Sequence, residues 1–341
     1  MKLKRSKLII RIILLIGTPI SLYFIPWILV RIWLTPLPDT IEDQMLKTLD
    51  YGFEGMIVYV DQAGKAPQTY AAGWHERENE TAARTDALFK IASIRKLYDA
   101  VAVTKLVSDG RLSLDKTLAD YMPELVGFID NADEITIRLM IQHRSGIPNY
   151  TDAPGFWEKL HSYEECLALI EGMLANFEPD KDYEYCNTNY LLIQKIMNNI
   201  LGYDNFQFIK EEILDRLNLH NSYGSLNEVK INDIMSGYHQ GYPLNLRTDD
   251  HGMLATVEDV GIFLRALNDG SLFDEGEKDM YASIYEFEHS GWVPGYQSFA
   301  KYHEDLDAVV IQFYSTTDKK LLLWNLSQII NKRIYRIIKK N

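Results

Sequence analysis

The longest hydrophobic stretch of the chain lies close to its N-terminus. Nineteen residues from Ile12 to Val30 carry no charge, and a helix of that length, at about 1.5 Å per residue, crosses the core of a bilayer. Five basic residues precede this stretch, whereas only Arg31 follows it closely. Because basic segments stay on the cytoplasmic side, we predict a transmembrane signal anchor over residues 1–35, with the N-terminus in the cytoplasm and the rest of the chain outside.

A cleaved signal peptide is the alternative for this segment. Such a peptide has a shorter apolar region and a cleavage site of small residues, and the sequence WILVRIWLTPLPDT offers no A-x-A-like site. We therefore favour a retained anchor in which Pro19 and Pro26 kink the helix. Trp27 and Trp33 are expected at the outer interface of the membrane.

Apolar positions predict two β-hairpins, one near each end of the remaining chain. The first joins residues 55–60 and 69–73, and the second joins residues 298–302 and 308–314 across the turn HEDLD. A long, mainly helical stretch begins at residue 93 and ends near residue 216. One sheet built from distant segments, with helices inserted between them, predicts an α/β lobe and a second, helical lobe.

The predicted boundaries follow from this pattern. Residues 36–50 are expected to form a linker with a short helical start, and residues 51–341 a single domain of a size at the upper range for one compact unit. The α/β lobe comprises residues 51–92 and 236–341, and the helical lobe comprises residues 93–235. We expect a cleft where the two lobes meet.

The C-terminal segment, LLLWNLSQIINKRIYRIIKKN, has apolar residues at helical spacing with basic residues among them. We expect this helix to pack on the sheet through its apolar face. The alternative is a basic helix that lies near anionic lipid, because the domain is expected to be tethered to a membrane.

The charge of the chain argues against nucleic acid as a partner. Residues 1–40 hold six Lys or Arg and one Asp, so the rest holds 29 basic and 47 acidic residues, a net charge of −18. A surface that acidic repels phosphate backbones. Two cysteines, Cys166 and Cys186, make neither a disulfide scaffold nor a metal-ligand cluster, although one bond between them is compatible with an oxidising compartment.

Three short motifs carry candidate chemistry, and each occurs more than once. S-x-x-K occurs at Ser93, Ser113 and Ser298, Y-x-N at Tyr185 and Tyr203, and H-x-G at His289 and His239. Ser93 is favoured because it opens an apolar-periodic helix, so that Lys96 projects from the same face one turn later. Ser113 lies in a polar loop, and the serine and lysine of the third copy face opposite sides of a strand.

Together the motifs supply the parts of acyl transfer through a covalent serine intermediate. Ser93 at a helix N-terminus is the candidate nucleophile, and Lys96 and Tyr185 are the candidate proton acceptors, with the dominant base left open. Asn187 offers a donor and an acceptor that bridge the lysine and a substrate amide. An edge strand beginning at the third motif would place the backbone N–H of Trp292 beside that of Ser93, as an oxyanion hole.

Taken singly, each motif has a plain structural explanation. An S-x-x-K serine is often a helix N-cap beside a surface lysine, Y-x-N often caps a helix, and a lone histidine in a loop is usually a surface residue. The ordered combination of all three is what favours catalysis.

In this order the motifs resemble those of the class C β-lactamase-like and penicillin-binding-protein-like serine hydrolases. The resemblance extends from about Gly55 to Leu326 and includes stretches outside the three motifs. The segments similar to family segments are SDGRLSLDKTLADYMPEL, ITIRLMIQHRSGIPNY, DYEYCNTNYLLI, GMLATVEDVGIFLRAL and HSGWVPGY. These matches favour the motif copies at Ser93, Tyr185 and His289 over the other copies.

The resemblance implies a two-lobed β-lactamase/transpeptidase-like fold, in which an antiparallel sheet flanked by helices adjoins an all-α lobe. It implies no metal or organic cofactor and a small-molecule or peptide substrate. The roles it implies are nucleophile for Ser93, proton transfer for Lys96 and Tyr185, substrate binding for Asn187, His289 and Gly291, and oxyanion binding for the backbone N–H groups of Ser93 and Trp292.

Two residues depart from the family pattern. Leu97 follows the lysine where the family usually has a small residue, and Glu288 precedes the third-motif histidine where glycine is usual. We expect bulk and negative charge at the cleft rim to narrow the substrate range, and the charge of Glu288 to disfavour a substrate carboxylate nearby.

We therefore predict a membrane-anchored serine hydrolase that acts outside the cytoplasmic membrane on an amide or ester. Peptidoglycan stem peptides, cleaved in the manner of a D,D-carboxypeptidase, are the leading substrate class, and β-lactam hydrolysis and esterase action are alternatives. A non-hydrolytic β-lactam sensor or an inactive binding module is the alternative of a different class.

Overall fold

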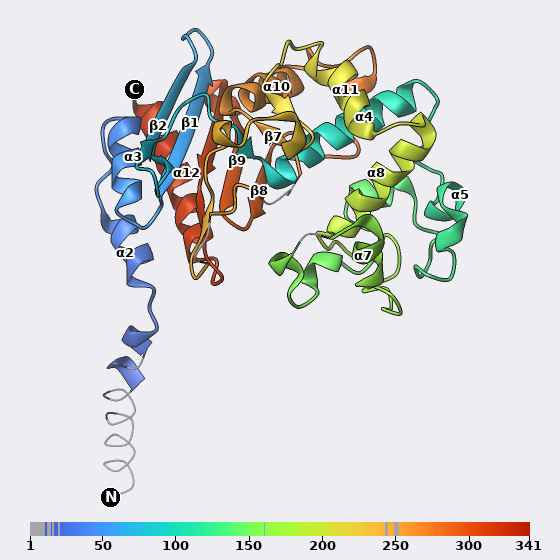
Figure 1. Cartoon of the computed structure of the whole chain (residues 1–341), viewed down its shortest axis with the longest axis horizontal. Helices are drawn as coiled ribbons and strands as arrows, with labels where there is room; N and C mark the ends of the chain where they lie inside the picture. Colours follow the sequence, from blue (N-terminus) through green and yellow to red (C-terminus); the bar gives the residue numbers. More distant parts are fainter. Residues whose placement is uncertain are drawn as a thin grey trace, which may run out of the picture.

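The centre of the structure is an antiparallel β-sheet, and both predicted hairpins are part of it. In the computed structural model, the described residues are 11, 15, 17–19, 21–159, 161–242, 245–248 and 252–341. Within them the sheet has six strands in the order β3-β2-β1-β10-β9-β8 (Figure 1). The strands are β1 (Gly55–Gln62), β2 (Gln68–Glu76), β3 (Thr81–Ala82), β8 (His289–Val293), β9 (Tyr296–His303) and β10 (Ala308–Tyr314).

Strand β1 shows why this sheet is covered on both faces. It pairs with β10 in the register Met56↔Tyr314, and its side chains alternate between two separate apolar clusters. Met56 and Val58 belong to the cluster that includes the C-terminal helix, whereas Ile57 and Tyr59 belong to the larger cluster that extends into the helical lobe. A strand buried on both faces reads as a continuous apolar run.

Three helices cover the first face: α2 (Trp27–Leu34), α3 (Ile41–Leu49) and α12 (Leu322–Lys340). The prediction that the C-terminal helix packs on the sheet is confirmed, since Leu326, Ile330 and Ile334 are fully buried there. The expected linker differs from the structure. Most of residues 36–50 form α3, which buries Met45 against this face, so the folded domain begins before residue 51.

The membrane anchor predicted for residues 1–35 falls partly outside the described residues. In the part that the structure describes, no single helix is long and apolar enough to cross a membrane. Two short helices, Gly17–Tyr23 and Trp27–Leu34, reach the required length and hydropathy only as a pair, with a bend of 76° between them. The bend lies next to Pro26, one of the two prolines at which the sequence predicts a kink, and the anchor itself stays a prediction.

The helical lobe is built around α4 (Arg95–Ser108), whose residues are almost all buried. Figure 1 shows this lobe to the right of the sheet, with α8 (Asn187–Leu201) next to α4. Its other helices are α5 (Leu118–Tyr121), α6 (Ile137–Ile141), α7 (Tyr163–Ala168) and α9 (Asn205–Ile209), and α11 (Glu277–Ala282) packs on α4 from the C-terminal half.

Short elements connect the lobes. Strands β4 (Phe89–Lys90), β7 (Leu254–Ala255) and β5 (Ser222–Tyr223) form a small sheet, and β6 (Tyr238–His239) pairs in parallel with β11 (Thr316–Thr317). Single turns of 3₁₀-helix are η1 (Ala92–Ile94), η2 (Pro123–Leu125), η3 (Tyr150–Asp152), η4 (Phe156–Glu158), η6 (Leu226–Glu228), η7 (Ile231–Asp233) and η8 (Glu304–Leu306), and η5 (Lys210–Leu214) is a π-helical turn.

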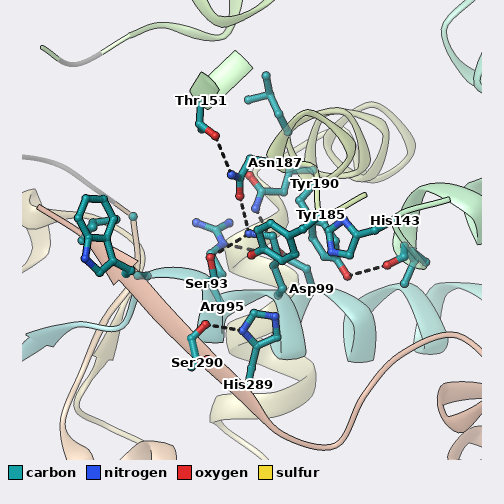
Figure 2. A pocket seen from close by; sticks show the side chains of 18 of the residues that line it. Ser93, Arg95, Asp99, His143, Thr151, Tyr185, Asn187, Tyr190, His289 and Ser290 are labelled. Atoms are coloured by element: carbon teal, nitrogen blue, oxygen red, sulfur yellow. Dashed lines mark hydrogen bonds and ion pairs between the residues drawn. The ribbon is translucent and has the colours of Figure 1, made fainter. Parts of the chain in front are cut away.

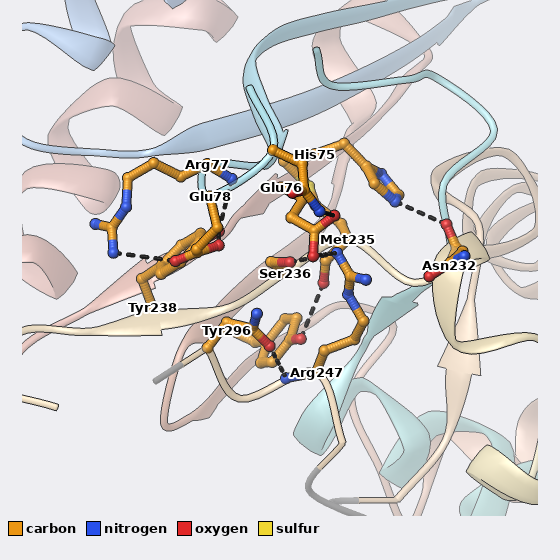
Figure 3. Close-up of polar contacts among 12 residues, drawn as sticks. His75, Glu76, Arg77, Glu78, Asn232, Met235, Ser236, Tyr238, Arg247 and Tyr296 are labelled. Atoms are coloured by element: carbon orange, nitrogen blue, oxygen red, sulfur yellow. Dashed lines mark hydrogen bonds and ion pairs between the residues drawn. The ribbon is translucent and has the colours of Figure 1, made fainter. Parts of the chain in front are cut away.

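A polar network fixes the segment that returns from the helical lobe to the sheet (Figure 3). Arg247 Nη2 donates to Ser236 Oγ at 2.6 Å and lies 3.2 Å from Glu76 Oε1 at the end of β2. The hydroxyl of Tyr238 donates to Glu78 Oε2 at 2.7 Å. The Arg247–Glu76 ion pair attaches the segment to the end of β2, and the Tyr238–Glu78 bond attaches it to the turn that follows.

Helix α10 (Val257–Asp269) covers the second face of the sheet, and one glycine lets it come close. A Cβ added to Gly261 would lie 2.2 Å from the ring of Tyr59 on β1. Glycine lowers the helix propensity of α10 at this position, but it allows the helix to pack closely against β1.

We predict that Gly261→Ala destabilises the protein even though alanine is the better helix former. The helix gains about 1 kcal/mol in propensity, whereas overpacking against the Tyr59 ring, at the short distance of 2.2 Å, costs about 2–3 kcal/mol. Urea unfolding should show a net loss of about 1–2 kcal/mol. Adding Tyr59→Leu to this variant should recover part of the loss, and a variant as stable as the wild type would contradict the account.

Candidate active site

Three segments that are distant in sequence meet at the junction of the lobes. The amine of Lys96 donates to Ser93 Oγ at 3.1 Å and to Asn187 Oδ1 at 2.9 Å (Figure 2). Lys96 lies on α4 and Asn187 begins α8, so one buried amine joins the first two motifs. The third motif arrives on β8, where His289 lines the same cleft.

The backbone before the nucleophile candidate is held in an uncommon conformation. Ala92 has φ +50°, in the left-handed region that non-glycine residues rarely adopt. The carbonyl of Ile91, one residue earlier, accepts from Ser298 Oγ at 2.8 Å, and its N–H donates to Met253 O at 3.1 Å. Strained backbone of this kind persists where its surroundings hold it, and it often occurs at functional sites.

Gly291 explains how β8 reaches the start of α4. A Cβ at this position would lie 2.4 Å from Ile91 O and 2.5 Å from Ser298 Oγ. Only glycine allows this approach, because the obstructing atoms include backbone. Since β8 is the last strand of the described sheet, its outer edge faces η1, which carries Ser93. Trp292 follows on this edge, which agrees with the predicted oxyanion hole without testing it.

The structure also shows what the other S-x-x-K copies do. Ser298 is buried in β9 and bonds to Ile91 O, so it supports the turn that carries Ser93. Lys301, three residues later, bonds to Glu288 at 2.6 Å. Ser113 accepts from the backbone N–H of Asp115 in a loop.

Asn187 is oriented by contacts on both sides of its amide. Its Nδ2 donates to Thr151 Oγ1 at 3.1 Å, which leaves Oδ1 to face the amine of Lys96. Its backbone N–H donates to Asn149 Oδ1 at 3.0 Å. Asn149 and Thr151 were not predicted, because nothing in the local sequence pairs them with a residue 36 positions or more away.

Tyr185 lies between the amine and two histidines. Lys96 Nζ is 5.0 Å from the centre of the Tyr185 ring. The ring centre of His143 lies 4.5 Å away on one side and that of His289 lies 6.2 Å away on another. The Tyr185 ring therefore lies beside the Lys96 amine and lines the cleft.

His289 is a neutral residue in this site. Burial, followed by the positive charge of Lys96, lowers the pKa of His289 to about 3. Its Nδ1 lies 2.7 Å from the carbonyl oxygen of Ser290. Because a carbonyl only accepts, Nδ1 carries the proton and Nε2 keeps its lone pair. The ring thus offers the cleft a hydrogen-bond acceptor rather than a charge.

His143 is a site residue that the motif analysis missed. It is 3% exposed, its Nδ1 accepts from the backbone N–H of Cys186 at 3.1 Å, and its ring packs on those of Tyr185, Tyr190 and Tyr285. Burial lowers the pKa of His143 to about 3. It therefore supports Tyr185 as a neutral ring, and its only signal in the sequence was its place in the segment ITIRLMIQHRSGIPNY.

Asp99 is a second residue that the motifs did not reveal. It is fully buried one turn beyond Lys96 on α4, accepts from Gln194 Nε2 at 2.8 Å, and lies 3.5 Å from Arg95 Nε. Burial raises the pKa of Asp99, and the neighbouring cations, Arg95 and Lys96, oppose that shift. The Asp99 side chain therefore serves as a buried hydrogen-bond acceptor one turn from Lys96.

The cleft has a volume of about 970 Å³ and an aromatic wall. Trp157 on η4 and Trp292 on β8 meet edge to face, with ring centres 5.6 Å apart. Among its described lining residues outside Lys96, each Lys or Arg pairs with an acid: Arg95 with Asp99, Lys159 with Glu165 and Lys301 with Glu288. In the described residues no cluster of three or more His, Cys, Asp or Glu could hold a metal ion.

The structure places the two residues that depart from the family pattern, Leu97 and Glu288, in different surroundings. Leu97 is fully buried in the apolar core and does not line the cleft, so its expected bulk at the rim is a wrong inference. Glu288 does line the cleft, but its carboxylate is paired with Lys301. Cys166 and Cys186 are both buried and free, so the bond left open between them is absent.

Comparison with known families agrees with this geometry. Residues 38–300 match the family described as Beta-lactamase. The chain belongs to the Beta-lactamase family. The predicted membership of the β-lactamase-like and penicillin-binding-protein-like serine hydrolases is thereby confirmed at the level of the family.

Curated relatives are distant and longer. Protein flp of Staphylococcus aureus (strain N315) is 24% identical over 215 residues, which cover 61% of this chain and 43% of that protein. Penicillin-binding protein 4 of Amycolatopsis lactamdurans is 30% identical over 157 residues, which cover 45% and 40%. The matched part of the chain therefore spans less than half of the length of these relatives.

Solved structures share the fold of this family member. D-amino acid amidase from Ochrobactrum anthropi SV3, complexed with D-phenylalanine, has a TM-score of 0.76 at 21% identity and covers 88% of this chain and 98% of its own. The penicillin binding protein from Bacillus halodurans has a TM-score of 0.70 at 18% identity, with coverage of 85% and 99%. At these identities the likeness shows the fold alone, and the two-lobed fold prediction is confirmed.

We predict that His143 makes the protein less stable in acid. Its pKa is about 3 in the folded state and about 6.5 when unfolded. The unfolded state therefore binds the proton first, and stability falls as the pH drops from 6.5 towards 3. At pH 5 the loss from this residue is about 2 kcal/mol.

The test compares His143→Asn with the wild type by urea unfolding at pH 7 and pH 5. Asparagine tolerates the φ of +57° at this position and keeps an acceptor for the Cys186 N–H. The variant should lose about 2 kcal/mol less than the wild type between the two pH values. The same substitution at the exposed His220 controls for the loss of a histidine, and equal pH dependence in His143→Asn and wild type would refute the assignment.

Proposed function

We propose that this chain is a serine hydrolase that acts through an acyl-enzyme on amide or ester substrates, with Ser93 as the nucleophile. The observation that carries the proposal is the contact of the Lys96 amine with Ser93 Oγ and Asn187 Oδ1. A serine hydroxyl needs an adjacent proton acceptor to attack at neutral pH, and Lys96 and Tyr185 are the groups placed to serve it.

The reaction proceeds in two halves. Ser93 Oγ attacks the substrate carbonyl carbon while its proton passes to a base beside it, which is either the Lys96 amine in its unprotonated form or the phenolate of Tyr185. The backbone N–H groups of Ser93 and Trp292 bind the negative oxygen of the tetrahedral intermediate. The leaving amine or alcohol takes up the proton as its bond to carbon breaks. Water then attacks the acyl-enzyme by the reverse proton path and releases the acid.

His289, Gly291 and Asn187 position the substrate in this proposal. Nε2 of the neutral His289 accepts a hydrogen bond, and the Asn187 amide bridges the Lys96 amine to a substrate amide. Gly291 contributes indirectly, because its missing side chain lets β8 approach the turn that carries Ser93.

The proposed substrates are peptidoglycan stem peptides, cleaved outside the cytoplasmic membrane by a domain held through the N-terminal anchor. A cleft of about 970 Å³ has room for a short peptide, and the proteins to which the chain is similar include penicillin-binding proteins. β-Lactam hydrolysis and ester cleavage use the same steps. A D,D-carboxypeptidase also needs a cation for the terminal carboxylate of its substrate. Lys301 is the candidate for this cation, and its amine forms an ion pair with Glu288 in the structure.

The role of Ser93 as the nucleophile can be tested by covalent labelling. The full chain in detergent, treated with a fluorophosphonate or a penicillin, should gain the mass of one adduct, and Ser93→Ala should gain none because the attacking oxygen is gone. Ser113→Ala, in the S-x-x-K copy in a loop, is the matched control and should react like the wild type. Intact-mass measurement reads the result.

Two outcomes would change the assignment. An adduct retained in Ser93→Ala would end the proposed role of this serine. A wild-type penicillin adduct that persists for hours would favour the non-hydrolytic β-lactam sensor, because a sensor acylates but does not deacylate.

A further prediction concerns the effect of the Glu288–Lys301 ion pair on substrate binding. This ion pair is partly exposed, at 43% and 27% of the side chains, so its rupture costs about 1 kcal/mol or less. Glu288→Gln should free the Lys301 cation and lower KM for a peptide with a terminal carboxylate by about threefold to tenfold relative to the same peptide as its amide. Glu286→Gln removes one charge from the same rim and leaves the pair intact. An equal effect of both variants would show that only the net charge matters.

A further inference from the structure

Helix α2 carries large apolar residues on both its buried and its exposed side, which is unusual for a helix at the surface of a domain. Ile28, Leu29 and Ile32 pack against the apolar cluster of α12 and the sheet. On the opposite side, Trp27 and Leu34 are 55% and 69% exposed, and their spacing of seven residues places them on one stripe. A helix that is apolar all round is expected in a core or a membrane, not in water.

A buried arginine holds this helix to the domain. Arg333 on α12 donates to the carbonyl oxygens of Ile32, Thr35 and Pro36 at 3.3, 2.9 and 2.8 Å, and to Gln44 Oε1 at 2.7 Å. The last carbonyl groups of a helix have no hydrogen-bond donor within the helix. Here the Arg333 guanidinium donates to the carbonyl of Ile32 in α2 and to the two carbonyls of Thr35 and Pro36 that follow. The end of α2 is therefore attached to α12 rather than free to swing on a linker.

The chain turns sharply just before α2. The helices Gly17–Tyr23 and Trp27–Leu34 are bent by 76° relative to each other, with Pro26 between them. The indole N–H of Trp27 donates to Leu22 O across the bend at 3.0 Å. If the first helix runs along the membrane normal, α2 lies close to the membrane plane.

Exposed cations lie on α2 itself and on α12, the helix to which Arg333 attaches it. Arg31 lies on α2, and Lys332 and Arg336 lie on α12 on either side of the buried Arg333. The chain after residue 40 carries a net charge of −18, so a local group of exposed cations runs against the overall balance. Cations beside exposed tryptophan match the headgroup region of an anionic bilayer.

We propose that α2 lies in the interface of a phospholipid bilayer as a rigid elbow between the membrane segment and the catalytic domain. This inference rests on the anchoring proposed above and adds the partner of the α2 surface and the orientation of the domain. The adjoining helix α3 lies over β2, whereas the Ser93 site lies at β8, the other end of the strand order. The elbow therefore fixes the cleft at a set position away from its membrane contact.

The test uses the full chain in nanodiscs that contain anionic lipid, with and without bromine on the acyl chains near the headgroups. Bromolipid should quench wild-type tryptophan emission, and Trp27→Phe together with Trp33→Phe should remove most of the quenched component. Trp74→Phe on β2 is the matched control, with Trp74 37% exposed, and should leave that component unchanged.

The outcomes separate the elbow from the anchoring on which it rests. A chain that enters nanodiscs but shows no quenching of the α2 tryptophans refutes the elbow and leaves the anchor intact. A chain that does not enter nanodiscs refutes both. Absence of quenching together with chemical cross-links between two copies through α2 would assign this stripe to a dimer interface and also overturn the proposal.

Arg333→Met tests the rigidity of the elbow in the same nanodiscs. Amide hydrogen exchange at residues 32–37 should become faster, while turnover of a soluble ester should stay unchanged because the site is at the far end of the sheet. Arg336→Met removes an exposed cation from the same helix and serves as the control. Equal exchange in the two variants would show that Arg333 does not hold α2.

Discussion

The candidate site depends on the placement of one amine, that of Lys96. A buried ammonium is costly unless hydrogen bonds replace its water, and here the replacements are Ser93 on the preceding turn and Asn187 at the start of α8. Asp99, one turn further along α4, is fully buried and accepts a hydrogen bond from Gln194. The contacts of Lys96 therefore dock α8 on α4 and position the nucleophile candidate, so the packing of the helical lobe and the chemistry cannot be separated.

A second constraint is the distance between β8 and the turn before Ser93. Backbone atoms approach there so closely that Gly291 has no room for a side chain, and Ala92 accepts a left-handed conformation. Ser298, buried in the neighbouring strand, holds the turn through Ile91 O. Strand and helix are thus fixed to each other by backbone contacts, which is the precision that two oxyanion donors from different elements require.

The sheet separates this site from the N-terminal attachment. Helices α2, α3 and α12 cover one face of the sheet, and the helical lobe lies to the right of the sheet in Figure 1. The cleft is lined by residues of that lobe and of β8, the last strand in the order. Arg333 joins α12 to the end of α2 through carbonyl oxygens, while the exposed side of α2 stays apolar. An element anchored on one side and apolar on the other is the physical basis for the inferred contact with lipid.

The sequence by itself determined the family, the two-lobed fold and the packing of the C-terminal helix, because ordered motifs and local periodicity carry that information. It also placed Ser93 and Lys96 one turn apart. Only the tertiary structure decided that His143 supports Tyr185, that Arg333 holds α2, and that the expected linker is helix α3. Each of these depends on contacts between residues tens to hundreds of positions apart, which a local sequence pattern does not record. The 76° bend before α2 was also decided by the tertiary structure, because a hydropathy pattern gives the length of an apolar segment but not the angle between its helices.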